Sequence, residues 1–168
     1  FSEEQINEAL REEDPLELVP STDVEGHGTF LASVACGSAD PVHRFVGAAP
    51  ESKIAVVKLK PAKDYLKAFY AIRPDAPCYQ ENDIILGLAY LNRLAEQEQM
   101  PLVICLAMGT NFGGHNGSTL LSALLDTYAY TMDRAVVIGV GNEAANRHHF
   151  NHRFLENQES VTAEIRVG

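Results

Sequence analysis

The order of apolar and polar residues along the chain predicts helices and strands that alternate. Residues 2–13 have helical spacing, and Ser2 and Gln5 stand at the separation of a capping box. Pro15 and Pro20 then predict an extended connector, because the residue before a proline avoids the helical region. The chain therefore opens with one helix that should run to about Glu13.

Two further elements follow the connector. An apolar face predicts a helix that begins after His27 and stops near Gly37. Residues 53–59 are apolar on both faces and rich in β-branched side chains, which is typical of a strand buried in a parallel sheet. Residues 61–80 lack a clear period, and we expect a surface insertion there.

The second half of the chain alternates helix and strand patterns. A long helix should run from a cap at Asn82 or Asp83 to about Gln99, and residues 101–107 and 135–140 predict two buried strands. Between these strands, Ser118 is the expected cap of a helix whose buried stripe comprises Leu120, Leu124, Tyr128 and Met132. This order predicts an α/β fold, a three-layer α/β/α sandwich with a mainly parallel sheet.

The last residues follow a different pattern. Val161, Ala163, Ile165 and Val167 alternate with polar residues, as in a half-exposed antiparallel strand. We therefore expect residues 1–150 to form one α/β domain. Residues 151–168 should begin a second, all-β element.

Composition and charge exclude several classes of partner. The chain has 168 residues, 46% of them hydrophobic, with a formal net charge of −10. An acidic protein is a poor match for a phosphate backbone or an anionic lipid surface, so neither nucleic acid nor membrane is an expected partner. Three widely spaced cysteines, Cys36, Cys78 and Cys105, indicate reduced thiols in a core and no disulfide framework.

The two ends of the sequence carry less information. No leader pattern for export is present in this piece. The reduced-thiol pattern favours an intracellular setting. Phe1 is not a natural start, so we expect the chain to be an excised piece of a longer protein. Loss of neighbouring strands would leave unpaired strand edges, through which the piece could self-associate.

The candidate for chemistry is His27, which lies between Gly26 and Gly28 at the start of a predicted helix. The glycines permit a tight turn and leave the imidazole uncrowded. Histidine can take up and return a proton near neutral pH, as a general base must. The alternative interpretation is a buried histidine at a helix N-terminus.

Four short blocks stand out along the chain: His27-Gly28-Thr29, Gly47-Ala48-Ala49-Pro50, Ala107-Met108-Gly109 and Gly141-Asn142-Glu143. In their order and spacing they resemble subtilisin-like serine proteases, the subtilases of peptidase family S8. More narrowly, the chain is similar to clostridial Csp-type subtilases of spore germination in residues 6–10, 19–23, 78–84 and 141–149. That narrower resemblance implies a spore-associated protein with a jelly-roll domain inserted after residue 150.

The resemblance implies roles for individual residues. His27 corresponds to the base of a Ser-His-Asp triad, and Asn142 to the side-chain donor of the oxyanion hole. Two segments would bind a polypeptide substrate. Leu106, Ala107, Met108 and Gly109 correspond to the edge segment that pairs with the substrate backbone, and the segment from Gly139 to Gly141 corresponds to a wall of the pocket for the residue before the scissile bond. No cofactor is implied. Without the resemblance, Asn142 would be interpreted as an ordinary turn residue.

The sequence also departs from the family pattern. No strand ending in aspartate precedes His27, and Asp23 is a poor substitute for the triad aspartate. Ser118 lies between the substrate segment and Asn142, where the family has no nucleophile. We therefore expect the chain to have no protease activity by itself. Two alternatives remain: a catalytically inactive relative that binds peptides or proteins, and an unrelated α/β domain.

Other signals are weaker. His148, His149 and His152 could ligate a metal, but no carboxylate or cysteine stands at a supporting spacing, so we expect a solvated loop. The segment around Asp40 is too poor in oxygen ligands for a calcium site. The glycines from 139 to 141 do not complete a dinucleotide fingerprint. A cysteine hydrolase is disfavoured because Cys105 lies in a strand, where core packing is expected.

Overall fold

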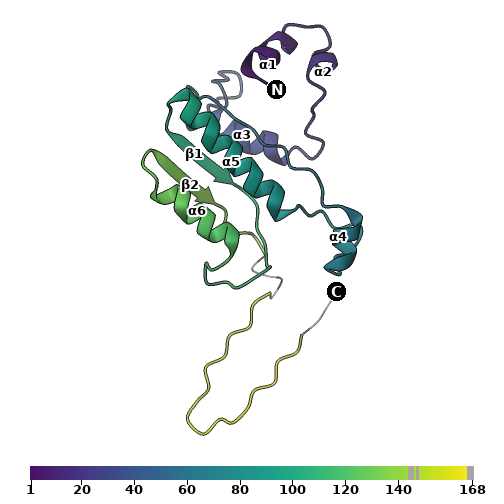
Figure 1. Cartoon of the computed structure of the whole chain (residues 1–168), viewed down its shortest axis with the longest axis vertical. Helices are drawn as coiled ribbons and strands as arrows, with labels where there is room; N and C mark the ends of the chain where they lie inside the picture. The colour runs from purple at the N-terminus through teal and green to yellow at the C-terminus, as the bar shows by residue number, and fades with distance from the viewer. Residues whose placement is uncertain (144–145, 147, 166–168) are drawn as a thin grey trace. The chain divides into compact units, whose positions relative to one another are not determined.

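The computed structural model describes residues 1–143, 146 and 148–165, and it divides into two compact units, Phe1–Val56 and Val57–Gly168 (Figure 1). Ala144 and Arg147, which belong to the Csp-like block, and Val167 of the alternating segment lie outside the described residues. Each unit is described by itself.

The first unit opens with helix α1, Glu3–Ala9. The predicted capping box is confirmed: the Gln5 N–H donates to Ser2 Oγ at 3.3 Å, and the Ser2 N–H donates to Gln5 Oε1 at 2.8 Å. The helix ends before the predicted Glu13. A second short helix, α2 (Pro15–Leu18), replaces part of the expected connector, because Asp14 caps it and proline is tolerated in a first turn.

Helix α3, His27–Cys36, is present as predicted and ends at Gly37. Its C-terminal end is closed by residues 47–49. Their backbone N–H groups donate at 2.8–3.0 Å to three carbonyls, those of Gly37, Val34 and Ala35. Gly47 is buried, and a Cβ there would overlap Gly37 N. The Gly-Ala-Ala block of the family pattern therefore caps this helix.

Residues 38–46 form a closed loop between α3 and its cap. Asp40 and Phe45 exchange two backbone hydrogen bonds, of 2.7 and 3.0 Å. The Asp40 carboxylate accepts from the backbone N–H groups of Val42 (2.9 Å) and His43 (3.1 Å), and its Oδ2 lies 2.7 Å from His43 Nδ1. The hydrogen bond with the His43 side chain is the main cause that lowers the pKa of Asp40. The Asp40 carboxylate thus stabilises the turn in which Asp40 itself lies.

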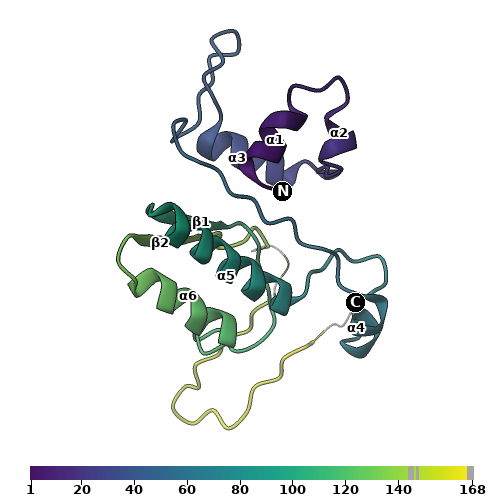
Figure 2. The same cartoon turned by 45° about the horizontal axis from the view of Figure 1, so that its top comes forward.

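The second unit contains a parallel sheet of β1, Leu102–Leu106, and β2, Arg134–Ile138. The pairing runs from Leu102 opposite Arg134 to Leu106 opposite Ile138. Helices α5 (Glu81–Glu98) and α6 (Leu120–Tyr130) pack against it (Figure 2). One residue from each contributing element forms the buried cluster: Leu88, Ile104 and Leu125. The predicted α/β fold with a parallel sheet is confirmed.

Both helices cover the face of the sheet that carries Ile104. Side chains alternate along a strand, so the residues beside Ile104 point to the opposite face. That face is open: Val103 is 68% exposed, Val137 is 55% exposed and Cys105 is exposed. The expectation that Cys105 packs in the core is therefore wrong. The cysteines are free thiols, and Cys36 and Cys78 are half-buried.

The predicted strand at residues 53–59 is not formed, and Ile54 and Val56 are 54% and 71% exposed. The segment nevertheless passes close to α5, where a Cβ added to Gly87 would lie 2.8 Å from Val57 Cγ1. A parallel strand exists only by pairing with a neighbour. Among the described residues, the sheet consists of β1 and β2 and does not include residues 53–59. The β-branched, apolar pattern of this segment is therefore not sufficient to form a strand.

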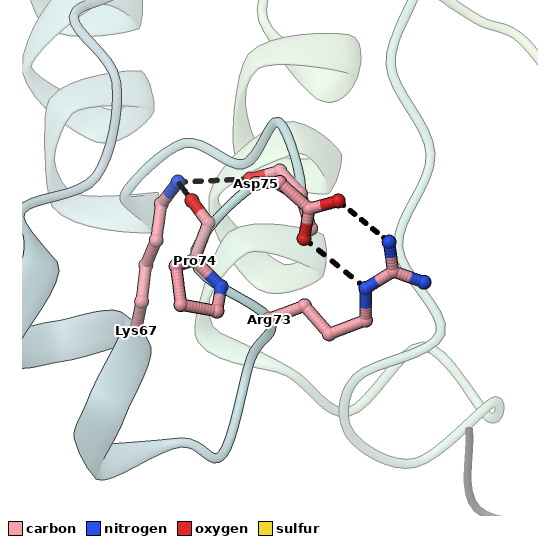
Figure 3. Close-up of polar contacts among 5 residues, drawn as sticks. Lys67, Arg73, Pro74 and Asp75 are labelled. Carbon is pink, nitrogen blue, oxygen red and sulfur yellow. Dashed lines mark hydrogen bonds and ion pairs between the residues drawn. The ribbon is translucent and has the colours of Figure 1, made fainter.

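The expected insertion at residues 61–80 is a closed surface loop with its own helix, α4 (Asp64–Phe69). An antiparallel bridge between Pro61 and Tyr79 closes its ends. Inside it, Lys67 Nζ donates at 2.9 Å to the carbonyls of both Pro74 and Ala76, while Arg73 and Asp75 form a two-bonded ion pair of 2.6 and 3.1 Å (Figure 3).

The caps of the two long helices differ from the prediction. Helix α5 begins at Glu81, before Asn82 and Asp83. The N-cap of α6 is Thr119, whose Oγ1 accepts from the Ser122 N–H at 3.1 Å. Ser118 instead donates to Asn116 Oδ1 at 2.6 Å. In the predicted stripe, Leu124 and Tyr128 pack against the core, but Leu120 and Met132 are 71% and 84% exposed.

Residues 148–165, drawn in yellow in Figure 1, have no assigned helix or strand. The β domain expected from residue 151 onward therefore stays a prediction.

Substitution of Ile104 tests the core of the second unit. Ile104→Ala is expected to lower the free energy of unfolding by about 2–5 kcal/mol, because Ile104 is 3% exposed and its truncation leaves a cavity between α5 and α6. The matched control, Val103→Ala on the open face, should change it by less than about 0.5 kcal/mol. Urea denaturation measures both, and equal effects would contradict the assignment of the buried face.

Candidate active site

The start of α3 is organised by the carboxylate of Asp23. Its Oδ2 accepts from the Thr29 backbone N–H and from Thr29 Oγ1, each at 2.8 Å. Its Oδ1 accepts from the backbone N–H groups of Gly26 at 2.9 Å and Glu25 at 3.2 Å. One side chain therefore satisfies donors both before and after His27.

These bonds favour the ionised form of Asp23 and lower its pKa from 3.8 to about 2, with the Thr29 backbone N–H as the largest cause. The pKa of Asp23 is lower in the folded state than in the unfolded state. The carboxylate therefore stabilises the turn fully at pH values above the ordinary pKa of 3.8. This stabilisation is lost as the pH falls through about 2. At neutral pH the turn around His27 is complete.

His27 is the first residue of α3, and its side chain is exposed. The preceding residue, Gly26, has a φ of 77°, in the left-handed region that glycine enters without strain. The turn thus presents the imidazole at the surface of the first unit. The alternative of a buried histidine is not what the structure shows.

In the second unit, the segments that follow β1 and β2 meet. The Gly139 N–H donates to the Leu106 carbonyl at 3.4 Å, which extends the contact between the strands beyond their ends. Farther along, Asn111 Nδ2 donates to Glu143 Oε2 at 3.1 Å. The two glycine-bearing strand ends predicted to form one site therefore lie side by side.

His148 joins this contact, a role that the sequence analysis missed. Its Nδ1 lies 2.8 Å from Asn111 Nδ2 and 3.3 Å from Glu143 Oε2. A neutral ring can accept from the amide at Nδ1, whereas a protonated ring donates from the same atom to the carboxylate. In the sequence, His148 is one of three histidines in a polar stretch for which a solvated loop is expected.

Asn142 lies in the segment after β2, between Glu143 and Gly141, and Gly141 has a φ of 82°. The Asn142 side chain is exposed, and no hydrogen bond links it to any other residue of the described ranges.

The predicted substrate-binding residues divide into two kinds. Leu106, Ala107 and Met108 are half-buried at the end of β1, while Gly109, Gly139 and Gly141 are exposed. A Cβ added at any of these three glycines would meet no atom within 4 Å. Open backbone is what an extended peptide needs in order to pair with a strand end, but the binding role stays a prediction.

His27 belongs to the first unit and Asn142 to the second, so their convergence on one cleft also stays a prediction. In the described part of the chain, no group of three His, Cys, Asp or Glu side chains is arranged to hold a metal ion. None of the described helices is long and apolar enough to cross a membrane.

Comparison with known proteins identifies the family. The Subtilase family model, Peptidase S8, matches residues 2–164. The solved structure of the Clostridium perfringens CspB protease matches with a TM-score of 0.71 and 32% sequence identity, over 85% of this chain and 28% of the CspB chain. The chain thus spans little more than a quarter of that protein. No curated protein matches it. The chain belongs to the subtilase family.

Proposed function

We propose that this chain supplies the general base, His27, and the side-chain oxyanion donor, Asn142, of a subtilisin-type serine endopeptidase. The triad aspartate and the nucleophilic serine lie outside these residues in this proposal. The observation that carries it is the fold match to a protease at 32% identity, together with an exposed Gly-His-Gly histidine at a helix start.

The chemistry assigned to each residue is the one that the family resemblance implies. The serine oxygen attacks the peptide carbonyl while the His27 imidazole takes the serine proton and then gives it to the leaving amine. Water hydrolyses the acyl-enzyme with the same base. Asn142 donates its amide N–H to the oxyanion, and a neutral donor stabilises that charge without forming an ion pair. The glycine-bearing strand ends would hold the polypeptide backbone.

The test compares the natural protein that contains this sequence with the isolated chain. The natural protein is expected to hydrolyse peptide bonds and to react covalently with a fluorophosphonate. Purified residues 1–168 are expected to give no labelling, because acylation needs a nucleophilic serine. Labelling of the isolated chain would contradict the assignment of roles. A natural protein that binds peptides without cleaving them would favour the inactive relative.

A further inference from the structure

We propose that Asp23 is a positioning residue for His27: its carboxylate fixes the turn from which the base acts. The inference rests on the proposed function only in naming His27 as the base. Asp23 is neither a triad member nor a substrate contact in this account.

The geometry places the carboxylate on both flanks of His27. Oδ1 binds the N–H groups of the two residues before it, Glu25 and Gly26, and Oδ2 binds Thr29, two residues after it. A Cβ added to Gly28 would lie 3.5 Å from Asp23 Oδ2, so the carboxylate also covers the residue that follows the histidine. The backbone of residue 27 is therefore held from both directions.

This arrangement requires two acceptor oxygens. Three backbone N–H groups and one hydroxyl converge on the carboxylate. An asparagine has nearly the same shape but offers only one acceptor oxygen. Its NH₂ group would therefore face either the two Thr29 donors or the N–H groups of Glu25 and Gly26. The charge adds to the effect, because a negative group is favoured near a helix N-terminus. Any loss of kcat in Asp23→Asn should therefore result from the lost hydrogen bonds of the carboxylate and not from altered packing.

The experiment measures steady-state kinetics of Asp23→Asn in the natural protein. We expect kcat to fall by up to about 10²-fold, the scale of a misplaced catalytic group, with KM unchanged because Asp23 does not contact substrate. The matched control is Asp40→Asn. Asp40 also accepts two backbone N–H groups, but it serves a turn beyond the opposite end of α3, so kcat should be unchanged.

A second measurement does not depend on activity. Hydrogen exchange of the peptide covering residues 24–30, followed by mass spectrometry, should be about tenfold faster in Asp23→Asn and unchanged in Asp40→Asn. In the unsubstituted protein, protection of the same peptide should decrease as the pH falls through the lowered pKa of Asp23. If the natural protein has no peptidase activity, the proposed function fails, while this exchange measurement still decides whether Asp23 fixes the turn.

Thr29→Val provides a milder variant in case Asp23→Asn does not fold. It removes the hydroxyl donor but keeps the Thr29 N–H bond to Asp23, so its loss of kcat should be smaller and in the same direction. Full kcat in both variants would overturn the inference. An equal fall in kcat in the Asp40→Asn control would do so as well.

Discussion

Replacement of His27 by alanine in the natural protein is expected to lower kcat by about 10⁶-fold, the magnitude known for loss of the triad histidine in subtilisin itself. The reason is that an alcohol is a weak nucleophile until a base accepts its proton, and this side chain would be that base. KM should change little. Initial rates of peptide hydrolysis, measured at substrate concentrations that span KM, separate the two constants.

The matched control for this substitution is His43→Ala. His43 also belongs to the first unit, and its side chain is 77% exposed and paired with Asp40. Its removal should leave kcat unchanged. If both substitutions lowered kcat equally, or if His27→Ala kept more than a few per cent of the activity, His27 would not be the base.

Replacement of Asn142 by alanine is the second large effect. It should lower kcat by about 10²–10³-fold with KM nearly unchanged, a magnitude again taken from subtilisin itself. The carboxamide would stabilise charge that exists only in the transition state, so ground-state binding would not need it. The expected signature is therefore a loss in kcat and in kcat/KM by the same factor.

Asn151→Ala is the control for Asn142. Asn151 is an exposed asparagine of the segment after the site, and its loss should leave kcat unchanged. A rise in KM at constant kcat in Asn142→Ala would contradict the oxyanion role and assign Asn142 to substrate binding instead. That result would not affect the assignment of His27.

The elements that could be predicted from sequence are those whose partners lie close along the chain. Helix α5, strand β1, helix α6 and strand β2 follow one another along the chain, and periodicity identifies each of them, as it also identifies α3. The segment 53–59 has an equally strong strand pattern, but a strand depends on a partner that its own residues do not specify. Cys105 was misplaced for a related reason, because an apolar run does not tell which face of a sheet is covered.

Some features of the candidate site could also be predicted from the sequence, and others could not. His27 is predicted from its Gly-His-Gly turn and Asn142 from the family resemblance, while the meeting of the two strand ends follows from a parallel sheet. The contacts of Asn111, Glu143 and His148 could not be predicted, because they join residues 32 and 37 positions apart. The role of Asp23 could not be predicted either, because its bonds to Thr29 reach six residues along the chain, beyond the two- or three-residue spacing of an N-cap.

The closed loop at residues 38–46 has a practical consequence. Its two ends are tied together where the Gly47 N–H donates to the Gly37 carbonyl at 2.9 Å, and the Asp40–Phe45 pair closes it a second time. Extra residues at the tip of this loop would therefore add little to the entropic cost of closing it, and they would not distort helix α3. An affinity epitope or a fluorophore-bearing peptide could be grafted there to follow the protein without disturbing the turn that carries His27.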